Sequence, residues 1–192
     1  MSATTALVVP LRAFTVGKER LAGVLGPDER AALSRRFADR VLDAAGGLPV
    51  AVVSSAAEVE EWARQRGAEV LADPGTLDDA ASVGREWGRE AGFDRVVVAH
   101  ADLARARTFD PVVGPDDRPV VTIVPDHRDD GTPVLALPTG ADFRFAYGPG
   151  SFSRHVLEAR RAGLGLRVVR SADLGFDVDL PEDLARVPVS AR

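Results

Sequence analysis

The fold of this chain is decided by Val8-Val9-Pro10-Leu11-Arg12-Ala13-Phe14-Thr15-Val16-Gly17-Lys18-Glu19-Arg20-Leu21. The apolar run over residues 6–9 predicts a buried strand, which Pro10 ends because proline cannot donate to a sheet ladder. A loop follows, and a helical pattern starts near Glu19. A strand that leads through a loop into a helix is a common phosphate-binding position in an open α/β sheet.

The loop is basic. Lys18 is the only lysine of the sequence, and it lies between Arg12 and Arg20. A compact ammonium group on a flexible stem suits a point contact with a polyphosphate. We therefore treat the loop as a candidate phosphate site, with a basic loop that contacts only solvent as the alternative.

The composition limits the possible classes of protein. The 192 residues predict one domain over residues 1–192, and a net charge of −5 argues against bulk attraction to nucleic acid or to an anionic membrane. The absence of cysteine excludes disulfides and thiolate metal sites, and three scattered histidines argue against a zinc site. Without a signal peptide or a segment long enough to span a membrane, we expect a cytoplasmic protein. A homodimer is left open.

Strands and helices alternate through the first half of the chain. We expect strands at residues 6–9, 48–53, 69–72 and 95–99, and helices at 27–45, 56–66 and 77–91. The three consecutive valines of the fourth strand are typical of a strand covered on both faces. The pattern predicts an α/β fold with a mostly parallel, doubly wound sheet and helices on both faces.

The second half is less regular. Strands are expected at residues 119–124, 134–137, 166–169 and 176–179, a helix at 151–162, and a final helical turn from Pro181. A long polar loop separates the first two of these strands.

Three aspartates are candidate metal ligands. Asp102 follows the valine strand, at the sheet edge where ligands of open α/β folds bind, although an Asp there is also a common turn or cap residue. Asp177 and Asp179 share one face of the last predicted strand, where their mutual repulsion would be relieved by a cation. The alternative is an exposed edge strand with a capping Asp. Together the three carboxylates would suit Mg²⁺ or Mn²⁺ and a bound triphosphate.

Two loops of small residues are candidate anion sites. One holds Gly131 and Thr132, and the other, Gly148-Pro149-Gly150-Ser151, opens a predicted helix whose N-terminus favours an anion. Ser151 adds a hydroxyl group, and it is equally suited to be a plain N-cap.

Taken in order, these pieces resemble the guanylyltransferase family of coenzyme F420 biosynthesis, whose members join GTP to 2-phospholactate or phosphoenolpyruvate. The resemblance covers nearly the whole chain. It rests on Pro10-Leu11-Arg12, Gly17-Lys18-Glu19-Arg20-Leu21, Asp73-Pro74-Gly75, His100-Ala101-Asp102-Leu103, Pro125-Asp126, Gly131-Thr132, Phe145-Ala146-Tyr147-Gly148-Pro149-Gly150-Ser151-Phe152, His155 and Asp177-Val178-Asp179.

The resemblance implies a single-domain nucleotidyltransferase fold of the GT-A type and a role for each piece. Mg²⁺ is held by Asp102, Asp177 and Asp179. The phosphorylated three-carbon acid is held by Thr132, Gly148 and Ser151. GTP is held by Pro10, Leu11, Arg12, Lys18 and Arg20 at the triphosphate and by Asp73 and Gly75 near the nucleoside, with Lys18 and Asp102 as the catalytic pair.

Four residues depart from the usual family pattern. Ala104 replaces a proline, Pro133 an asparagine, Asp78 an asparagine, and Glu19 a serine or threonine. These changes bear on the acid and on the preference for guanine, and they remove no metal ligand. The Arg- and Ala-rich composition is typical of a GC-rich bacterium, and bacterial members of the family are associated with phosphoenolpyruvate, which we therefore expect as the acid.

The expected reaction is nucleotidyl transfer with release of pyrophosphate. A phosphate monoester is already largely ionised at neutral pH, so no protein base is required. Two alternatives are a related nucleotidyltransferase with another phosphorylated acceptor and a nucleotide-binding module without turnover.

Overall fold

The protein, seen in a computed structural model that describes residues 4–114 and 119–187, follows the expected alternation of strands and helices. In chain order its elements are β1 (Thr5–Pro10), the 3₁₀ turn η1 (Glu19–Leu21), α1 (Pro27–Ala44), β2 (Val50–Val53), α2 (Ala57–Gln65), β3 (Glu69–Leu71), α3 (Leu77–Glu90), β4 (Arg95–Ala99), β5 (Val120–Val124), β6 (Val134–Pro138), α4 (Ser151–Arg161), β7 (Gly165–Val168) and α5 (Pro181–Ala185). Within those ranges, every helix is too short or too polar to span a bilayer.

All seven strands form one sheet in the order β3-β2-β1-β4-β6-β5-β7. Neighbouring strands are parallel except around β6, which runs antiparallel to both β4 and β5. The mostly parallel α/β sheet predicted from the alternation is therefore confirmed. Because β1 and β4 are parallel neighbours, the loops that leave them meet at one edge of the sheet.

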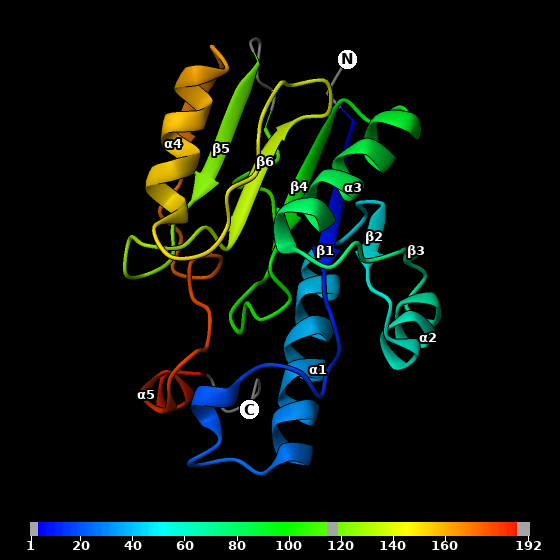
Figure 1. Cartoon of the computed structure of the whole chain (residues 1–192), viewed down its shortest axis with the longest axis vertical. Coiled ribbons are helices and arrows are strands. Elements are labelled where there is room, and N and C mark those ends of the chain that lie inside the picture. Colours follow the sequence, from blue (N-terminus) through cyan, green and yellow to red (C-terminus); the bar gives the residue numbers. More distant parts are fainter. Residues whose placement is uncertain (1–3, 115–118, 188–192) are drawn as a thin grey trace.

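Both faces of the sheet are covered by helices (Figure 1). Leu7 and Val9 of β1 point to the core shared with α1 and α2, and Val8 points to the core shared with α3 and α4. The valines of β4 alternate in the same way, so the central strands are buried on both sides.

Helix α3 lies unusually close to the sheet, because it presents small residues to the strands. A Cβ atom at Gly84 would lie 2.1 Å from Val8 Cγ1, and one at Gly88 would lie 2.4 Å from Val96 Cγ1. Figure 1 shows α3 across β1 and β4. This close approach brings the first turn of α3 to the edge of the sheet where these strands end.

Two local expectations were wrong. The helical pattern near Glu19 yields only the single turn η1, because Gly23 and Gly26 follow and glycine is a poor helix former. Residues 176–179 form no strand but a single bridge between Leu103 and Asp177. Their backbone groups are bound by side chains instead, since Lys18 takes the carbonyl of Val178.

Candidate active site

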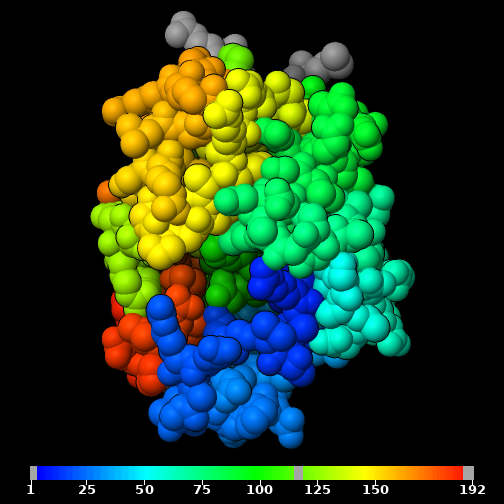
Figure 2. Space-filling view, viewed as in Figure 1, coloured from blue at the N-terminus to red at the C-terminus, as the bar shows by residue number. Residues whose placement is uncertain are grey.

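A cleft of about 450 Å³ opens at the edge of the sheet where β1 and β4 end. Its walls come from residues 10–13 and 16–18 of the N-terminal loop, from residues 100–102 after β4, and from Leu77 and Asp179. Figure 2 shows the hollow between the blue N-terminal loop and the yellow segment above it. A larger hollow of about 570 Å³ lies between α1 and α5, but it includes none of the candidate carboxylates.

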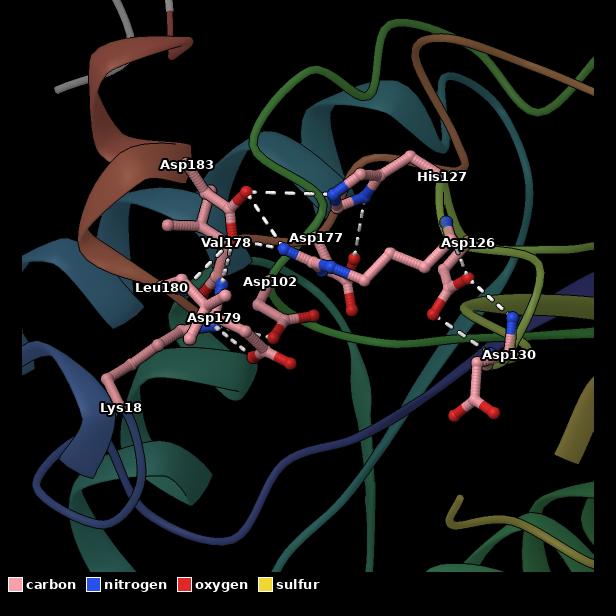
Figure 3. A network of polar contacts seen from close by, with 12 residues as sticks. Lys18, Asp102, Asp126, His127, Asp130, Asp177, Val178, Asp179, Leu180 and Asp183 are labelled. Atoms are coloured by element: carbon pink, nitrogen blue, oxygen red, sulfur yellow. Dashed lines mark hydrogen bonds and ion pairs between the residues drawn. The ribbon is translucent and has the colours of Figure 1, made fainter. Parts of the chain in front are cut away.

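Lys18 lies among the candidate metal ligands (Figure 3). Its Nζ donates to Asp102 Oδ2 at 2.6 Å and to the carbonyl oxygen of Val178 at 2.7 Å, and it lies 3.9 Å from Asp179 Oδ1. The Lys18 side chain is only 7% exposed, and its backbone adopts a left-handed conformation with φ of 54°. The loop after β1 therefore turns the only lysine inward, away from bulk solvent.

The three aspartates influence one another electrostatically. Burial raises the pKa of Asp177 to about 7, and the carboxylates of Asp102 and Asp179 add to the rise. Burial also opposes ionisation of Asp102, but Lys18, together with His100 and a backbone hydrogen bond, outweighs it and holds the pKa of Asp102 below its ordinary value. The cluster thus carries more negative charge than one lysine neutralises.

The donor set fits a divalent cation. Asp102 Oδ1 and Asp177 Oδ1 are buried and have no hydrogen-bond partner among the described residues; such groups are rare and need an explanation. Carboxylate oxygens are the ligands that Mg²⁺ prefers. In the described part of the chain no three side chains already stand in the geometry of a metal site. The Lys18 ammonium lies where a cation shared by Asp102 and Asp179 would lie.

A second group of residues, not anticipated from the sequence, holds the segment of Asp177 and Asp179 in place. Asp183 is fully buried in the first turn of α5 and accepts hydrogen bonds from the backbone N–H groups of Asp179 and Leu180. His127 lies between Asp177 and Asp183, 3.6 Å from a carboxylate oxygen of each. Pro181 marks the start of a helix whose first turn favours acidic residues, a signal that could have identified Asp183; no signal pointed to His127.

The two loops expected at the nucleotide meet each other. Arg12 donates to the carbonyl oxygen of Gly75, and Asp73 Oδ1 accepts from the N–H of Gly75 at 2.9 Å. Pro10, Leu11 and Arg12 line the cleft. Arg20 lies outside it, in a shallower hollow of about 310 Å³ that also includes Lys18 and Asp179.

Two of the residues expected at the acid, Thr132 and Ser151, form a separate buried cluster with His155, whereas Gly148 is exposed. Thr132 and Ser151 are 1% and 2% exposed, and their hydroxyl oxygens lie 3.4 Å apart. His155 Nε2 accepts from the N–H of Ala146, so the neutral ring donates from Nδ1 to Thr132 Oγ1 at 3.0 Å. Burial holds the pKa of His155 at about 4, which keeps the ring neutral. The Thr132 hydroxyl hydrogen is then free to donate to a ligand.

An internal carboxylate lies at the start of α4, where an anion was expected. Asp130 Oδ1 accepts from the N–H of Gly150 at 3.1 Å, and the Asp130 carbonyl accepts from the N–H of Phe152. Gly148, with φ of 100°, makes the turn that allows this arrangement.

Several side chains near the acid cluster already have protein partners. Arg128 donates to both carboxylate oxygens of Asp183, and Arg154 donates to the carbonyls of Ala146 and Tyr147. Both guanidinium groups therefore already bind oxygen atoms of the protein.

Two of the four departures from the family pattern take part in hydrogen bonds within the protein. Asp78 Oδ1 accepts from the N–H of Tyr147 at 2.6 Å, which ties the first turn of α3 to the loop before α4. The Pro133 carbonyl accepts from the N–H of His100 at 2.9 Å, and Ala104 is fully buried. Glu19 is exposed. Asp78 thus contacts the protein backbone through one carboxylate oxygen.

Comparison with known proteins identifies relatives over almost the whole chain. The profile of the family described as "Guanylyl transferase CofC like" matches residues 5–190. A phosphoenolpyruvate guanylyltransferase of Sphaerobacter thermophilus is 38% identical over 188 residues, which cover 94% of this chain and 91% of the relative. A 2-phospho-L-lactate guanylyltransferase of Methanothermobacter thermautotrophicus is 29% identical, with 95% of this chain and 83% of the relative covered.

The fold also has counterparts among solved structures. A putative nucleotide-diphospho-sugar transferase from Desulfovibrio desulfuricans G20 superimposes with a TM-score of 0.76 at 19% identity, over 99% of this chain and 88% of that one. At this identity the likeness concerns the fold alone, and it agrees with the GT-A-type architecture that the resemblance implied.

Proposed function

The chain belongs to the family of CofC-like guanylyl transferases, and on that premise we propose that it transfers GMP from GTP to phosphoenolpyruvate in coenzyme F420 biosynthesis. The observation that carries the proposal is the convergence of Lys18 with three aspartates at the end of the cleft. Relatives named for phosphoenolpyruvate reach 38% and 37% identity, against 35% and 29% for relatives named for 2-phospho-L-lactate, which favours the first acid.

The reaction joins two anions. A phosphate oxygen of the acid attacks the α-phosphorus of GTP, the new P–O bond forms, and the bond from the α-phosphorus to the bridging oxygen breaks. Pyrophosphate leaves with that electron pair. Because the phosphate is already ionised near neutral pH, the residues of the site act by positioning the reactants and by neutralising charge.

We assign the charge-neutralising role to two groups. Asp102, Asp177 and Asp179 would hold Mg²⁺, which when bound offsets the charge of the triphosphate. Lys18, which lies beside Asp102 and Asp179, would contact the β- and γ-phosphates. The Arg12–Gly75 contact would keep the loops of residues 10–18 and 73–75 together around the nucleotide.

On the acid side, Thr132, Gly148 and Ser151 would receive the three-carbon acid. Because Thr132 Oγ1 accepts from the neutral His155, the Thr132 hydroxyl group can donate its hydrogen to an anion, which supports this role.

The test is a direct competition between acids. Purified protein, GTP and Mg²⁺ are mixed with equal amounts of phosphoenolpyruvate, 2-phospho-L-lactate and 3-phosphoglycerate, and guanylylated products are identified by mass spectrometry. We expect the phosphoenolpyruvate adduct to dominate. Exclusive formation of another adduct would overturn the choice of acid, and no adduct with any acid would overturn the proposed reaction.

A further inference from the structure

Two aromatic side chains connect the nucleotide half of the site with the acid half. His100 follows β4 and lines the cleft beside Lys18 and Asp102. Its backbone N–H donates to the carbonyl oxygen of Pro133, the residue after Thr132. Tyr147 lies in the loop before α4. The His100 and Tyr147 rings are 5.6 Å apart, and Tyr147 in turn contacts His155 edge-on at 4.9 Å. A path of side chains thus runs from the carboxylates to the acid cluster.

Both aromatic residues carry a buried polar atom with no hydrogen-bond partner in residues 4–114 and 119–187, namely His100 Nε2 and Tyr147 Oη. The other histidines differ. His155 binds through both ring nitrogens, and each ring nitrogen of His127 faces a carboxylate. Buried polar groups are hydrogen-bonded in most native proteins, so unpaired ones need an explanation.

A ligand explains both atoms at once. An acid held at Thr132 must direct its phosphate toward the carboxylates at Asp102, and His100 and Tyr147 lie between these two places. An imidazole N–H and a phenol O–H are neutral donors, which suit the anionic oxygens of a phosphate or carboxylate.

We propose that His100 and Tyr147 bind the substrate, and that both donate hydrogen bonds to the phosphorylated acid where it extends from Thr132 toward Asp102. The identity of the acid rests on the proposed function, but the two donors and the class of acceptor do not. Neither residue was assigned a role at the level of the sequence.

The sharpest test is Tyr147→Phe, which removes one oxygen atom and keeps the ring. We expect the dissociation constant of phosphoenolpyruvate, measured by calorimetry with a GTP analogue that has a methylene group between the α- and β-phosphorus, to rise at least tenfold. The affinity for the analogue alone should change less than twofold. The melting temperature should stay the same or rise, because an unpaired buried hydroxyl is lost.

Thr139→Val is the matched control. Its hydroxyl group is also buried, but it donates to the carbonyl of Phe93 at 2.8 Å, away from the cleft. This variant should melt at a lower temperature and bind the acid as the wild type does.

His100→Phe and His100→Gln form the second pair. The Phe variant should weaken acid binding as Tyr147→Phe does, and the Gln variant, which restores a donor, should recover part of it. Unchanged acid affinity in both Tyr147→Phe and His100→Phe would overturn the inference, and so would a lower melting temperature of Tyr147→Phe with unchanged acid affinity.

Failure of the proposed function is recognised separately. If the wild type guanylylates none of the acids, the same variants are compared for binding of phosphoenolpyruvate and of inorganic phosphate. Weaker binding by both Phe variants supports the inference, and equal binding overturns it.

Discussion

At the scale of single residues, the site contains three carboxyl groups and one lysine, whose single positive charge neutralises only part of their negative charge. Asp102 is kept ionised by Lys18, whereas Asp177, buried and close to the other carboxylates, has a pKa near 7. The pKa values of these two carboxyl groups are thus shifted in opposite directions. The pH dependence of the free energy of unfolding without metal therefore reports how strongly the carboxylates of the cluster interact.

Asp177 should make the metal-free protein less stable as the pH rises. Its carboxyl ionises near 3.8 as an unperturbed group but near 7 in the folded chain, so the folded state holds the proton more tightly between these values. Stability that is present below pH 4 is lost as the pH rises through 7, by on the order of 2–4 kcal/mol. Asp177→Asn cannot ionise and should be more stable than the wild type at pH 8. Urea unfolding in EDTA at pH 5 and 8 measures this, with the exposed Asp110→Asn as control; equal pH slopes for wild type and Asp177→Asn would contradict the prediction.

Lys18 should discriminate nucleotides by their phosphates. Lys18→Ala is expected to weaken GTP binding much more than GMP binding, because GMP lacks the β- and γ-phosphates that the ammonium would contact. Calorimetry in Mg²⁺ compares the two ligands. An equal loss for GTP and GMP would show that Lys18 serves only to order the carboxylates.

At the scale of elements, the sequence predicted what depends on local pattern. The helices and all seven strands of the described residues lie within two residues of the expected bounds at each end, since apolar periodicity and glycine or proline boundaries are local signals. The expected strand at 6–9 starts at Thr5 and includes Pro10. The miss at Glu19 follows from Gly23 and Gly26, whereas residues 176–179 form a segment whose backbone groups are bound by distant side chains. Such partners, Lys18 for Val178 and Asp183 for Asp179, are invisible in a local window.

The close contact of α3 with the sheet gives a prediction at this scale. Alanine is a better helix former than glycine by about 1 kcal/mol, yet Gly84→Ala should destabilise the protein, because its Cβ would lie 2.1 Å from Val8 Cγ1. A cost of about 1–3 kcal/mol is typical of an overpacked core. Thermal unfolding measures it, and Val8→Ala in the same chain should relieve part of it. Gly23→Ala, where nothing lies within 4 Å, is the control. An increase in stability for Gly84→Ala would refute the close packing.

At the scale of the whole molecule, the site joins two halves of the sheet. The parallel half, β3-β2-β1-β4, supplies the loops expected at the nucleotide, and the loop before β6 together with the segments after β6 supplies the residues expected at the acid. The sequence could name most of these residues, since each follows a strand or opens a helix. It could not show that Arg128 and Arg154 are engaged by the protein, or that His100 and Tyr147 connect the halves, because those facts depend on tertiary contacts.

The hydrogen bond from the N–H of Tyr147 to Asp78 Oδ1 should couple the nucleotide half of the site to the acid half. Asp78→Asn keeps an oxygen that accepts from the N–H of Tyr147 and should retain near-wild-type kinetics. Asp78→Ala leaves that N–H without its partner, so the loop that carries Gly148 should loosen. The expected signature is faster amide hydrogen exchange at Tyr147 together with a several-fold higher KM for the acid. If instead Asp78→Asn and Asp78→Ala both change the KM for GTP and leave the exchange of Tyr147 untouched, then Asp78 contacts the base, and the tie between the halves of the sheet lies elsewhere.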